Sequence, residues 1–355
     1  MVLANAHFVR AFCYYWIARI WGDAPILLEG FESDDQEDLF PTRQSVDDVF
    51  QQVGEDIEQA LALMPVSVID RNLASPGSIQ LLKADYNLWL YGVRNGGETA
   101  LNKADKAVQS VLSNSQYGLE EDYASIFRNE LGKEIIFAWS YIQDEYTGGY
   151  PEDYLVPSQY VSAEVIENPV KVGSHQQWCF YTDDYKKLLS ENVSDQRTIV
   201  SFQTYYDAPK NATFQWINKF SGTWTNETRI FDSDIIVYRY ADALLFDAEI
   251  KLVRGDRSGA ITSLNRIAAR AYGEAGAYPS TLSVTDIKEA IVRERMKEFA
   301  AEGKLWWDFI RLGVVFEKVP FLAGREQEPN VLLWPISQNS INKNPNLVQT
   351  PGYDK

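Results

Sequence analysis

The sequence predicts a mainly α-helical protein in which helix pairs are interrupted by a long, irregular region rich in aromatic residues. Apolar residues recur at helical spacing over residues 2–122 and again over 234–313. Between residues 123 and 233 this periodicity is lost, and Gly, Pro and aromatic residues punctuate the chain. We therefore expect one domain over residues 1–355: a helical scaffold in two parts (1–122 and 234–313), a loop-rich ligand-binding region (123–233) and an extended C-terminal segment (314–355).

The composition disfavours several classes of function. With 355 residues the chain is long enough to bury a sizeable core. Its formal net charge of -17 at pH 7 repels phosphate backbones and anionic lipid surfaces, which argues against nucleic acid as a partner. There is also no stretch of about eighteen apolar residues that could span a bilayer.

Cysteine and histidine are too few for a disulfide framework, a zinc site or His-based catalysis. The two cysteines, Cys13 and Cys179, lie among aromatic residues, where a small buried thiol is expected. The two histidines, His7 and His175, are interpreted as ordinary side chains. We therefore predict no metal and no cofactor.

Four helices are expected in the first part of the scaffold. They are predicted over residues 2–21, 46–64, 78–91 and 98–112. The first is apolar nearly all round, so we expect something upstream or packed over it to cover it. Ser45 resembles a helix cap for the second helix, and about 33 residues separate Ser45 from Ser78. That spacing is close to the repeat of about 34 residues in tetratricopeptide proteins, although their consensus is not legible.

The region 123–233 has the composition of a binding surface. Residues 135–139 read as one short strand, and loops are predicted to follow. Aromatic residues concentrate there beside Asn, Gln, Asp and Thr rather than beside Leu and Val. A long, irregular, aromatic-rich insertion inside a helical chain is more often a binding surface than a folding device.

Regular helices are expected again from residue 234. One is predicted from Asp234 to Gly255, a second from Ser258 to Tyr272, and a helix, a glycine corner at Gly303 and a Trp-rich helix between Thr285 and Gly313. The last 42 or so residues are polar and punctuated by Pro, which predicts an extended strap over the domain.

Three carboxylates, Glu294, Glu298 and Glu302, continue the apolar stripe of the helix that begins at Thr285. They could be catalytic acids, as in a glycosidase. The favoured interpretation is a set of partly buried ion pairs with nearby cations, of which Arg293, Arg295 and Arg311 are closest in sequence. An arginine beside a carboxylate lowers its pKa, whereas a general acid needs a raised one.

Five segments resemble the SusD/RagB family of starch-utilisation-type lipoproteins, and they occur in family order over most of the chain. They are AHFVRAFCYYWIARIWGDAPIL, VYRYADALLFDAEI, ITSLNRIAARA, ERMKEFAAEGKLWWDFIRLG and LWPISQNSINKNPNLVQTPGY. The resemblance implies a SusD-like fold, with four tetratricopeptide-like helix pairs forming a right-handed superhelix and a large irregular subdomain. This agrees with the helix pairing inferred from periodicity.

The resemblance implies a non-catalytic function at the outer membrane of Gram-negative bacteria. Such proteins are surface lipoproteins that bind an oligosaccharide and pass it to a SusC-like TonB-dependent transporter. Members usually carry a signal peptide, an anchoring Cys and a further segment before the helix that opens this chain. The printed sequence holds none of these, so we expect a truncated form, an incomplete gene product or a short variant. Any membrane attachment would come only through a lipid anchor absent from this chain.

The ligand contacts are predicted in the aromatic-rich region. The segment 172–185 matches the family's binding-loop position, with Trp178 as a stacking platform and neighbouring polar groups as hydrogen-bond partners. The complete predicted set is His175, Gln176, Gln177, Trp178, Tyr181, Tyr205, Tyr206, Trp216 and Trp224. For the last four, packing is the favoured interpretation. Asp183 and Asp184 are interpreted as a helix cap rather than a calcium site.

Two other classes of function remain open on the sequence. Aromatic loops and acidic residues would also suit a helical-barrel glycoside hydrolase, which needs two carboxylates facing one cleft about 5 to 9.5 Å apart. Helix pairs alone would suit a tetratricopeptide-like scaffold for protein–protein interaction. Burial of every aromatic side chain in the loops would favour the scaffold.

Overall fold

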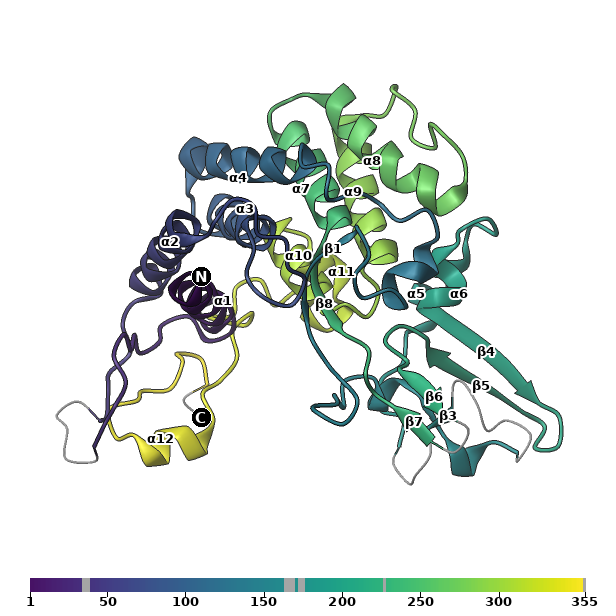
Figure 1. Cartoon of the computed structure of the whole chain (residues 1–355), viewed down its shortest axis with the longest axis horizontal. Coiled ribbons are helices and arrows are strands. Elements are labelled where there is room, and N and C mark those ends of the chain that lie inside the picture. Colours follow the sequence, from purple (N-terminus) through teal and green to yellow (C-terminus); the bar gives the residue numbers. More distant parts are fainter. Residues whose placement is uncertain (34–38, 163–169, 172–175, 226–227, 354–355) are drawn as a thin grey trace.

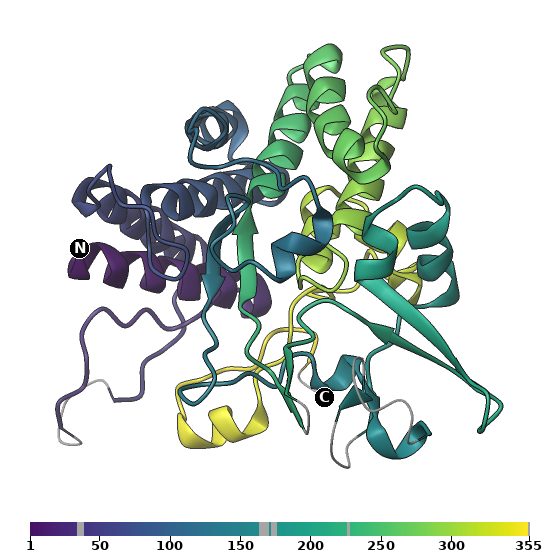
Figure 2. The same ribbon diagram turned by 45° about the vertical axis from the view of Figure 1, so that its right-hand side comes forward.

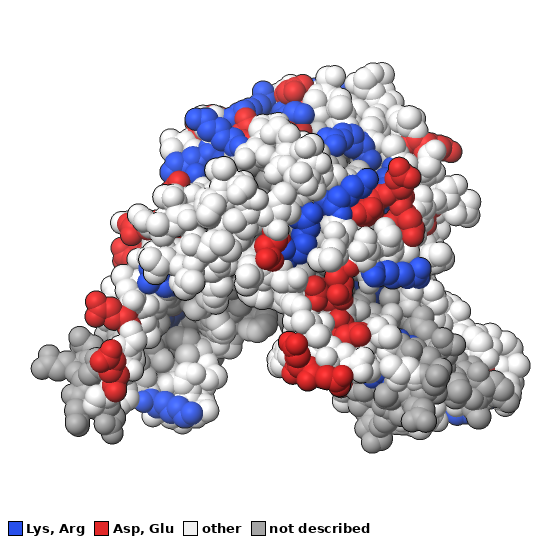
Figure 3. Space-filling view, in the orientation of Figure 1, with Lys and Arg blue, Asp and Glu red and all other residues white. Residues whose placement is uncertain are grey.

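The computed structural model describes residues 1–33, 39–162, 170–171, 176–225 and 228–353. Helices dominate the fold, as predicted, and they form an arch (Figure 1). The region 123–233 hangs below one end of the arch, and the C-terminal segment lies below the other. The turned view shows the hairpin of β4 (Phe202–Asp207) and β5 (Ala212–Ile217) projecting from the body (Figure 2), and the space-filling view shows a hollow between the two lower parts (Figure 3).

The first part of the scaffold consists of two packed helix pairs, and its predicted bounds are confirmed to within about two residues. The helices are α1 (Val2–Trp21), α2 (Val46–Leu63), α3 (Pro76–Val93) and α4 (Gly97–Leu112). The Ser45 side chain accepts from the Asp48 N–H, and Ser75 and Ser78 form a capping box at the start of α3. Helix α1 packs on α2 and α3 packs on α4, so each pair buries its apolar faces internally.

Helix α1 is covered on only part of its surface in the described structure. Phe8, Ala11 and Tyr15 face the core, whereas Val9 and Cys13 are exposed. The expectation of a buried thiol is wrong for Cys13, because it lies on the outer side of a helix that packs on one face. Cys179 is only half-buried.

A short two-stranded sheet joins the two parts of the scaffold. Strand β1 (Ile135–Trp139) confirms the predicted strand, and it pairs antiparallel with β8 (Ile235–Arg239). The helix predicted from Asp234 is therefore wrong over its first turn, because the β-branched run Ile235–Val237 forms a strand instead. Helix α7 (Tyr240–Val253) begins where the Asp242 carboxylate accepts from the Arg239 N–H.

The first two of the remaining scaffold helices pack against α7, and the third packs against α3. They are α8 (Arg257–Tyr272), α9 (Val284–Glu298) and α10 (Leu305–Arg311). Helix α9 ends four residues before Glu302, so the predicted single helix up to Gly303 is wrong. The chain turns there through positive φ angles at Ala301 (58°) and Gly303 (71°), a conformation that the glycine adopts without strain. The corner between two helices is nevertheless where the sequence placed it.

The region 123–233, called the aromatic-rich region below, contains more regular structure than predicted. Its strands and helices are η1 (Tyr123–Phe127), β1, η2 (Glu152–Tyr154), β2 (Val156–Pro157), η3 (Ser158–Tyr160), β3 (Val170–Lys171), α5 (Asp183–Ser190), α6 (Arg197–Ser201), β4 (Phe202–Asp207), β5 (Ala212–Ile217), β6 (Thr223–Thr225) and β7 (Thr228–Ile230). Strands β4 and β5 form an antiparallel hairpin in which Phe202 lies opposite Ile217. Loop composition had concealed this hairpin.

The C-terminal segment is mostly extended, as predicted, with short helical turns. These are α11 (Val315–Lys318), η4 (Pro320–Leu322) and α12 (Gln338–Lys343). The Trp334 N–H donates to the Ile20 carbonyl, and the Asn344 amide donates to the Pro41 carbonyl. The segment therefore ties the end of α1 to the α1–α2 connection.

The described residues contain neither a membrane-spanning helix nor a cluster of metal ligands. No helix in the described ranges is both long and apolar enough to cross a bilayer. Within the same ranges no group of three or more His, Cys, Asp or Glu side chains is arranged to hold a metal ion.

Candidate ligand-binding surface

The segment 176–181 presents two large aromatic side chains to solvent. Trp178 is 69% exposed and Phe180 is 65% exposed. Gln177, Cys179 and Tyr181 alternate with them and are less exposed, as expected for an extended chain whose successive side chains point to opposite sides. The two exposed rings therefore lie on one side of the segment. Exposure on this scale is unusual for Trp and indicates a contact surface.

The same segment is anchored along its inner side. The Gln177 side-chain amide donates to the carbonyls of Tyr154 (2.8 Å) and Gln215 (2.9 Å). The backbone N–H groups of Trp178 and Cys179 both donate to the Asp153 carbonyl. Gln177 is thus a residue that positions Trp178, because both of its amide donors are used internally.

Helix α5 follows the segment 176–181 and supports its C-terminal end. The Tyr181 ring contacts Tyr185 edge-on at 4.9 Å, and the Tyr185 hydroxyl donates to the Met296 carbonyl of α9. The Tyr181 ring also contacts Phe202 edge-on, so this side chain packs inward, and burial raises the pKa of its hydroxyl well above the ordinary value. Asp183 begins α5 and pairs with Lys186 at 2.7 Å, in keeping with a helix-start role.

The structure separates the second predicted group of contact residues. Trp216 is only 5% exposed and packs with Leu155 and Val156, so we exclude it from the contact surface. Tyr205 packs partly against the same cluster. Tyr206 is 58% exposed, and its hydroxyl donates to Asn211.

Three predicted residues stand apart from these. Gln176 is exposed beside Trp178. His175 lies outside the described residues. Trp224 belongs to strand β6, where it pairs with Arg229 across the ladder, and its side chain lies outside the described part. The sequence did not single out Phe180, which shares the exposed side of the segment.

Glu294, Glu298 and Glu302 are fully buried and paired with cations. The three form a charge network with Glu134, Asp195, Arg197, Lys219, Arg239 and Arg270. The structural interpretation of the carboxylates is confirmed, but the predicted partners are wrong. Arg293 instead pairs with Glu191, and Arg295 pairs with Asp308.

Arg239 occupies the centre of the charge network. Its Nη1 donates to Glu134 Oε1 at 2.7 Å and also to Glu298, its Nη2 donates to the Glu298 carbonyl at 2.7 Å, and its Nε donates to Glu302 Oε2 at 3.0 Å. Arg197, from α6 of the aromatic-rich region, reaches Glu294 Oε2 at 2.6 Å. The network therefore joins the aromatic-rich region to the scaffold.

The ionisation of these carboxylates opposes a role in acid catalysis. Burial alone would raise the pKa of Glu302, but Arg239, Lys219 and Lys304 lower it to about 2. Burial likewise opposes ionisation of Glu298, and three arginines hold its pKa well below the usual range. Burial lowers the pKa of Lys219 to about 8. A general acid would need a carboxyl with a raised pKa in an open cleft.

Comparison with known proteins agrees with the fold and the sequence motifs. The model of the SusD family matches residues 172–327, which include the anchored segment from Gln176 and the charge-bearing helix α9. The SusD-like protein P2 of Formosa agariphila is 26% identical over 385 residues, covering 99% of this chain and 74% of the relative. The chain is similar to the SusD family, over these residues by the family model and over nearly its whole length by this relative.

Solved structures of this family have the same fold. A SusD superfamily protein from Bacteroides vulgatus is 28% identical, with a TM-score of 0.83 over 99% of this chain and 80% of the other. The surface glycan-binding protein A from Bacteroides fluxus is 21% identical, with a TM-score of 0.76 over 99% of this chain and 77% of the other. The predicted SusD-like fold class is confirmed.

Proposed function

We propose that the protein binds an oligosaccharide without turning it over and passes it to a SusC-like TonB-dependent transporter at the outer surface of the outer membrane. The similarity to the SusD family supports the class of function, since the resemblance implies surface glycan binding. One structural neighbour is itself a surface glycan-binding protein, although at its identity the likeness supports the fold alone. The proposal includes lipid anchoring of the protein, as in other members of the family.

The exposed pair Trp178 and Phe180 is the observation that carries this proposal. Flat aromatic faces stack on the apolar C–H faces of sugar rings, and polar neighbours bind the hydroxyl groups. Because hydrogen bonds from Gln177, Trp178 and Cys179 hold the segment, little conformational entropy is lost when a sugar binds. Gln176, exposed next to Trp178, is the nearest predicted hydrogen-bonding side chain.

The two alternative functions receive less support. The three carboxylates that suggested a hydrolase are buried in ion pairs, and the cations around Glu298 and Glu302 lower the pKa of both. A pure scaffold would bury the aromatic side chains of the loops, but Trp178, Phe180 and Tyr206 are exposed.

Calorimetric titration with an oligosaccharide panel tests the proposal. We expect micromolar to millimolar affinity for at least one neutral oligosaccharide and no release of reducing ends. Trp178→Ala should lower that affinity by tenfold or more, because stacking on an aromatic ring contributes roughly 1–3 kcal/mol in comparable base-stacking contacts. Trp334→Ala is the matched control, since Trp334 is 55% exposed on the C-terminal segment.

Two results would contradict the proposal. One is the absence of binding across the panel, and the other is equal affinity of Trp178→Ala and the parent protein. The delivery step is tested separately, by co-purification of a TonB-dependent transporter from the native outer membrane. If the protein were recovered from the membrane without such a transporter, delivery would be contradicted and glycan binding would not be affected.

A further inference from the structure

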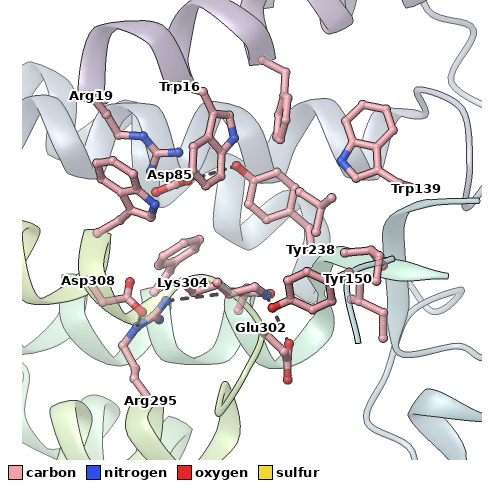
Figure 4. A pocket seen from close by; sticks show the side chains of 18 residues that line it. Trp16, Arg19, Asp85, Trp139, Tyr150, Tyr238, Arg295, Glu302, Lys304 and Asp308 are labelled. Atoms are coloured by element: carbon pink, nitrogen blue, oxygen red, sulfur yellow. Dashed lines mark hydrogen bonds and ion pairs between the residues drawn. The ribbon is translucent and has the colours of Figure 1, made fainter. Parts of the chain in front are cut away.

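A cavity of about 290 Å³ with aromatic residues in its lining lies between α1, β8 and the α9–α10 corner. Trp16 and Trp139 lie on one side of it, and Arg295, Asp308 and Lys304 lie on the other (Figure 4). Trp139 is 37% exposed and Arg295 is 1% exposed. The cavity therefore has an accessible aromatic wall and a deeply buried charged floor, a combination typical of small-molecule sites.

Several polar groups on the cavity lining are buried without a hydrogen-bond partner among the described residues. They are the donors Trp16 Nε1, Arg19 Nε and Arg295 Nη1. Asp308 Oδ2 is paired with Arg295 Nε at 2.7 Å, which leaves Arg295 Nη1 without such a partner. Buried polar groups are nearly always paired, so these donors indicate an additional occupant.

The lining carries three cations (Arg19, Arg295 and Lys304) and four carboxylates (Asp85, Asp242, Glu302 and Asp308), so it has no excess of positive charge and favours a neutral occupant. Each cation lies near a carboxylate: Arg19 is 3.8 Å from Asp85, Arg295 is 2.7 Å from Asp308, and Lys304 is 2.6 Å from Asp242. An anionic ligand would therefore meet carboxylates as well as cations, with no excess of positive charge to compensate it. Hydroxyl groups both donate and accept, so a polyol can serve the indole, the guanidinium and the carboxylate together.

We propose that this cavity is a second carbohydrate site that takes one neutral pyranose ring, stacked against Trp16 or Trp139 with its hydroxyl groups toward Arg295 and Asp308. This proposal rests on the proposed function for the class of ligand. It adds a site formed by residues of α1 and β1, separate from the Trp178 segment. The cavity volume of about 290 Å³ is at the lower limit of the range for small-ligand sites, about 300–1,000 Å³, which suits a single ring rather than a longer oligosaccharide.

Fluorine NMR of the protein labelled with 5-fluorotryptophan tests this proposal at both sites in one titration. The probes are the methyl pyranosides of glucose, galactose, mannose and N-acetylglucosamine, with methyl glucuronide as the acidic comparison. We expect one neutral pyranoside to shift the Trp16 and Trp139 resonances saturably, and the glucuronide to bind more weakly. Each resonance is assigned by its Trp→Phe variant.

Trp16→Phe keeps an aromatic ring but removes the indole N–H, so the affinity reported by Trp139 should fall about three- to tenfold. Trp334→Phe should leave it unchanged. If Trp16→Phe does not fold, Trp139→Phe provides the same comparison with Trp16 as the reporter. If neither resonance shifted with any pyranoside, the proposal would be overturned and water would be left as the occupant. If the glucuronide bound more tightly than the neutral pyranosides, the assignment of a neutral ligand would be overturned. The Trp178 resonance reports the surface site independently, so failure of the cavity and failure of the proposed function are distinguishable.

Discussion

The helical scaffold and the aromatic-rich region are held together by different forces. In the scaffold, apolar faces of successive helices pack on one another, and side chains such as Leu101, Leu244 and Leu264 are completely buried. The aromatic-rich region has only small apolar clusters of its own. Strand β1 contributes Ile136 and Phe137 to the scaffold core, and the rest of the region is joined to the scaffold by buried charges, with Arg197 and Lys219 reaching the carboxylates of α9 and its corner. Burial of apolar area is generic, whereas the charge network specifies where the region docks.

Removal of the central cation should produce the largest effect. Arg239→Met keeps a long apolar side chain but leaves Glu134, Glu298 and Glu302 without their shared partner. Breaking a buried ion pair by removing one partner typically costs about 3–5 kcal/mol. We expect a loss of this size in the free energy of unfolding measured with urea.

Arg325→Met is the matched control, because the Arg325–Glu328 pair lies on the surface. It should leave the urea midpoint almost unchanged. An Arg239→Met protein as stable as the parent would show that this central cation does not stabilise the charge network.

Acid should weaken the charge network between the aromatic-rich region and the scaffold. The pKa of Glu302 is about 2 in the folded protein and 4.5 ordinarily, so the unfolded chain binds more protons between these values. The stabilising contribution of Glu302 is therefore complete above about pH 4.5 and is lost as the pH falls toward 2, a change of roughly 3 kcal/mol. Urea unfolding at a series of pH values measures it.

Glu302→Gln removes this titration, so its stability should fall less steeply over the same pH interval. Glu328→Gln, on the surface, should follow the parent protein. Parallel curves for Glu302→Gln and the parent would show that Glu302 does not contribute to the acid sensitivity.

The two regions also differ in how far their sequence predicts them. Scaffold helices are bounded by local signals such as Ser45 and Gly22, which act within one turn, so their limits could be predicted. The partners of Glu298 could not, because Arg197 and Arg239 are distant in sequence and come together only through the tertiary fold. Residues 235–239 were misassigned because a short apolar run fits a strand or a helix equally well.

The candidate surface illustrates the same limit. Trp178 and Trp216 both lie among polar residues in a region without periodicity, yet one ring is 69% exposed and the other 5%. Whether an aromatic side chain points outward depends on the register of its segment, which the contacts of Gln177 fix here. Local sequence carries no signal of those contacts, so it indicates a binding region more reliably than it indicates the individual contacts.

The smallest expected effect comes from matched helix caps, one in each region. Ser45 caps α2 and Thr182 caps α5, each by accepting a backbone N–H three residues on. Replacing such a cap by Ala typically costs about 1 kcal/mol. Because α2 unfolds with the scaffold, Ser45→Ala should lower the global free energy of unfolding by that amount and leave oligosaccharide affinity unchanged.

Thr182→Ala should behave differently, because α5 is only 8 residues long and lies at the edge of the aromatic-rich region. We expect faster amide hydrogen exchange confined to α5 and the Trp178 segment, and weaker oligosaccharide binding as that segment loses its support, with little change in the urea midpoint. The opposite result would be that both cap variants lower the global stability equally and speed amide hydrogen exchange equally in both regions. The two regions would then unfold as one cooperative unit, completely coupled by the charge network.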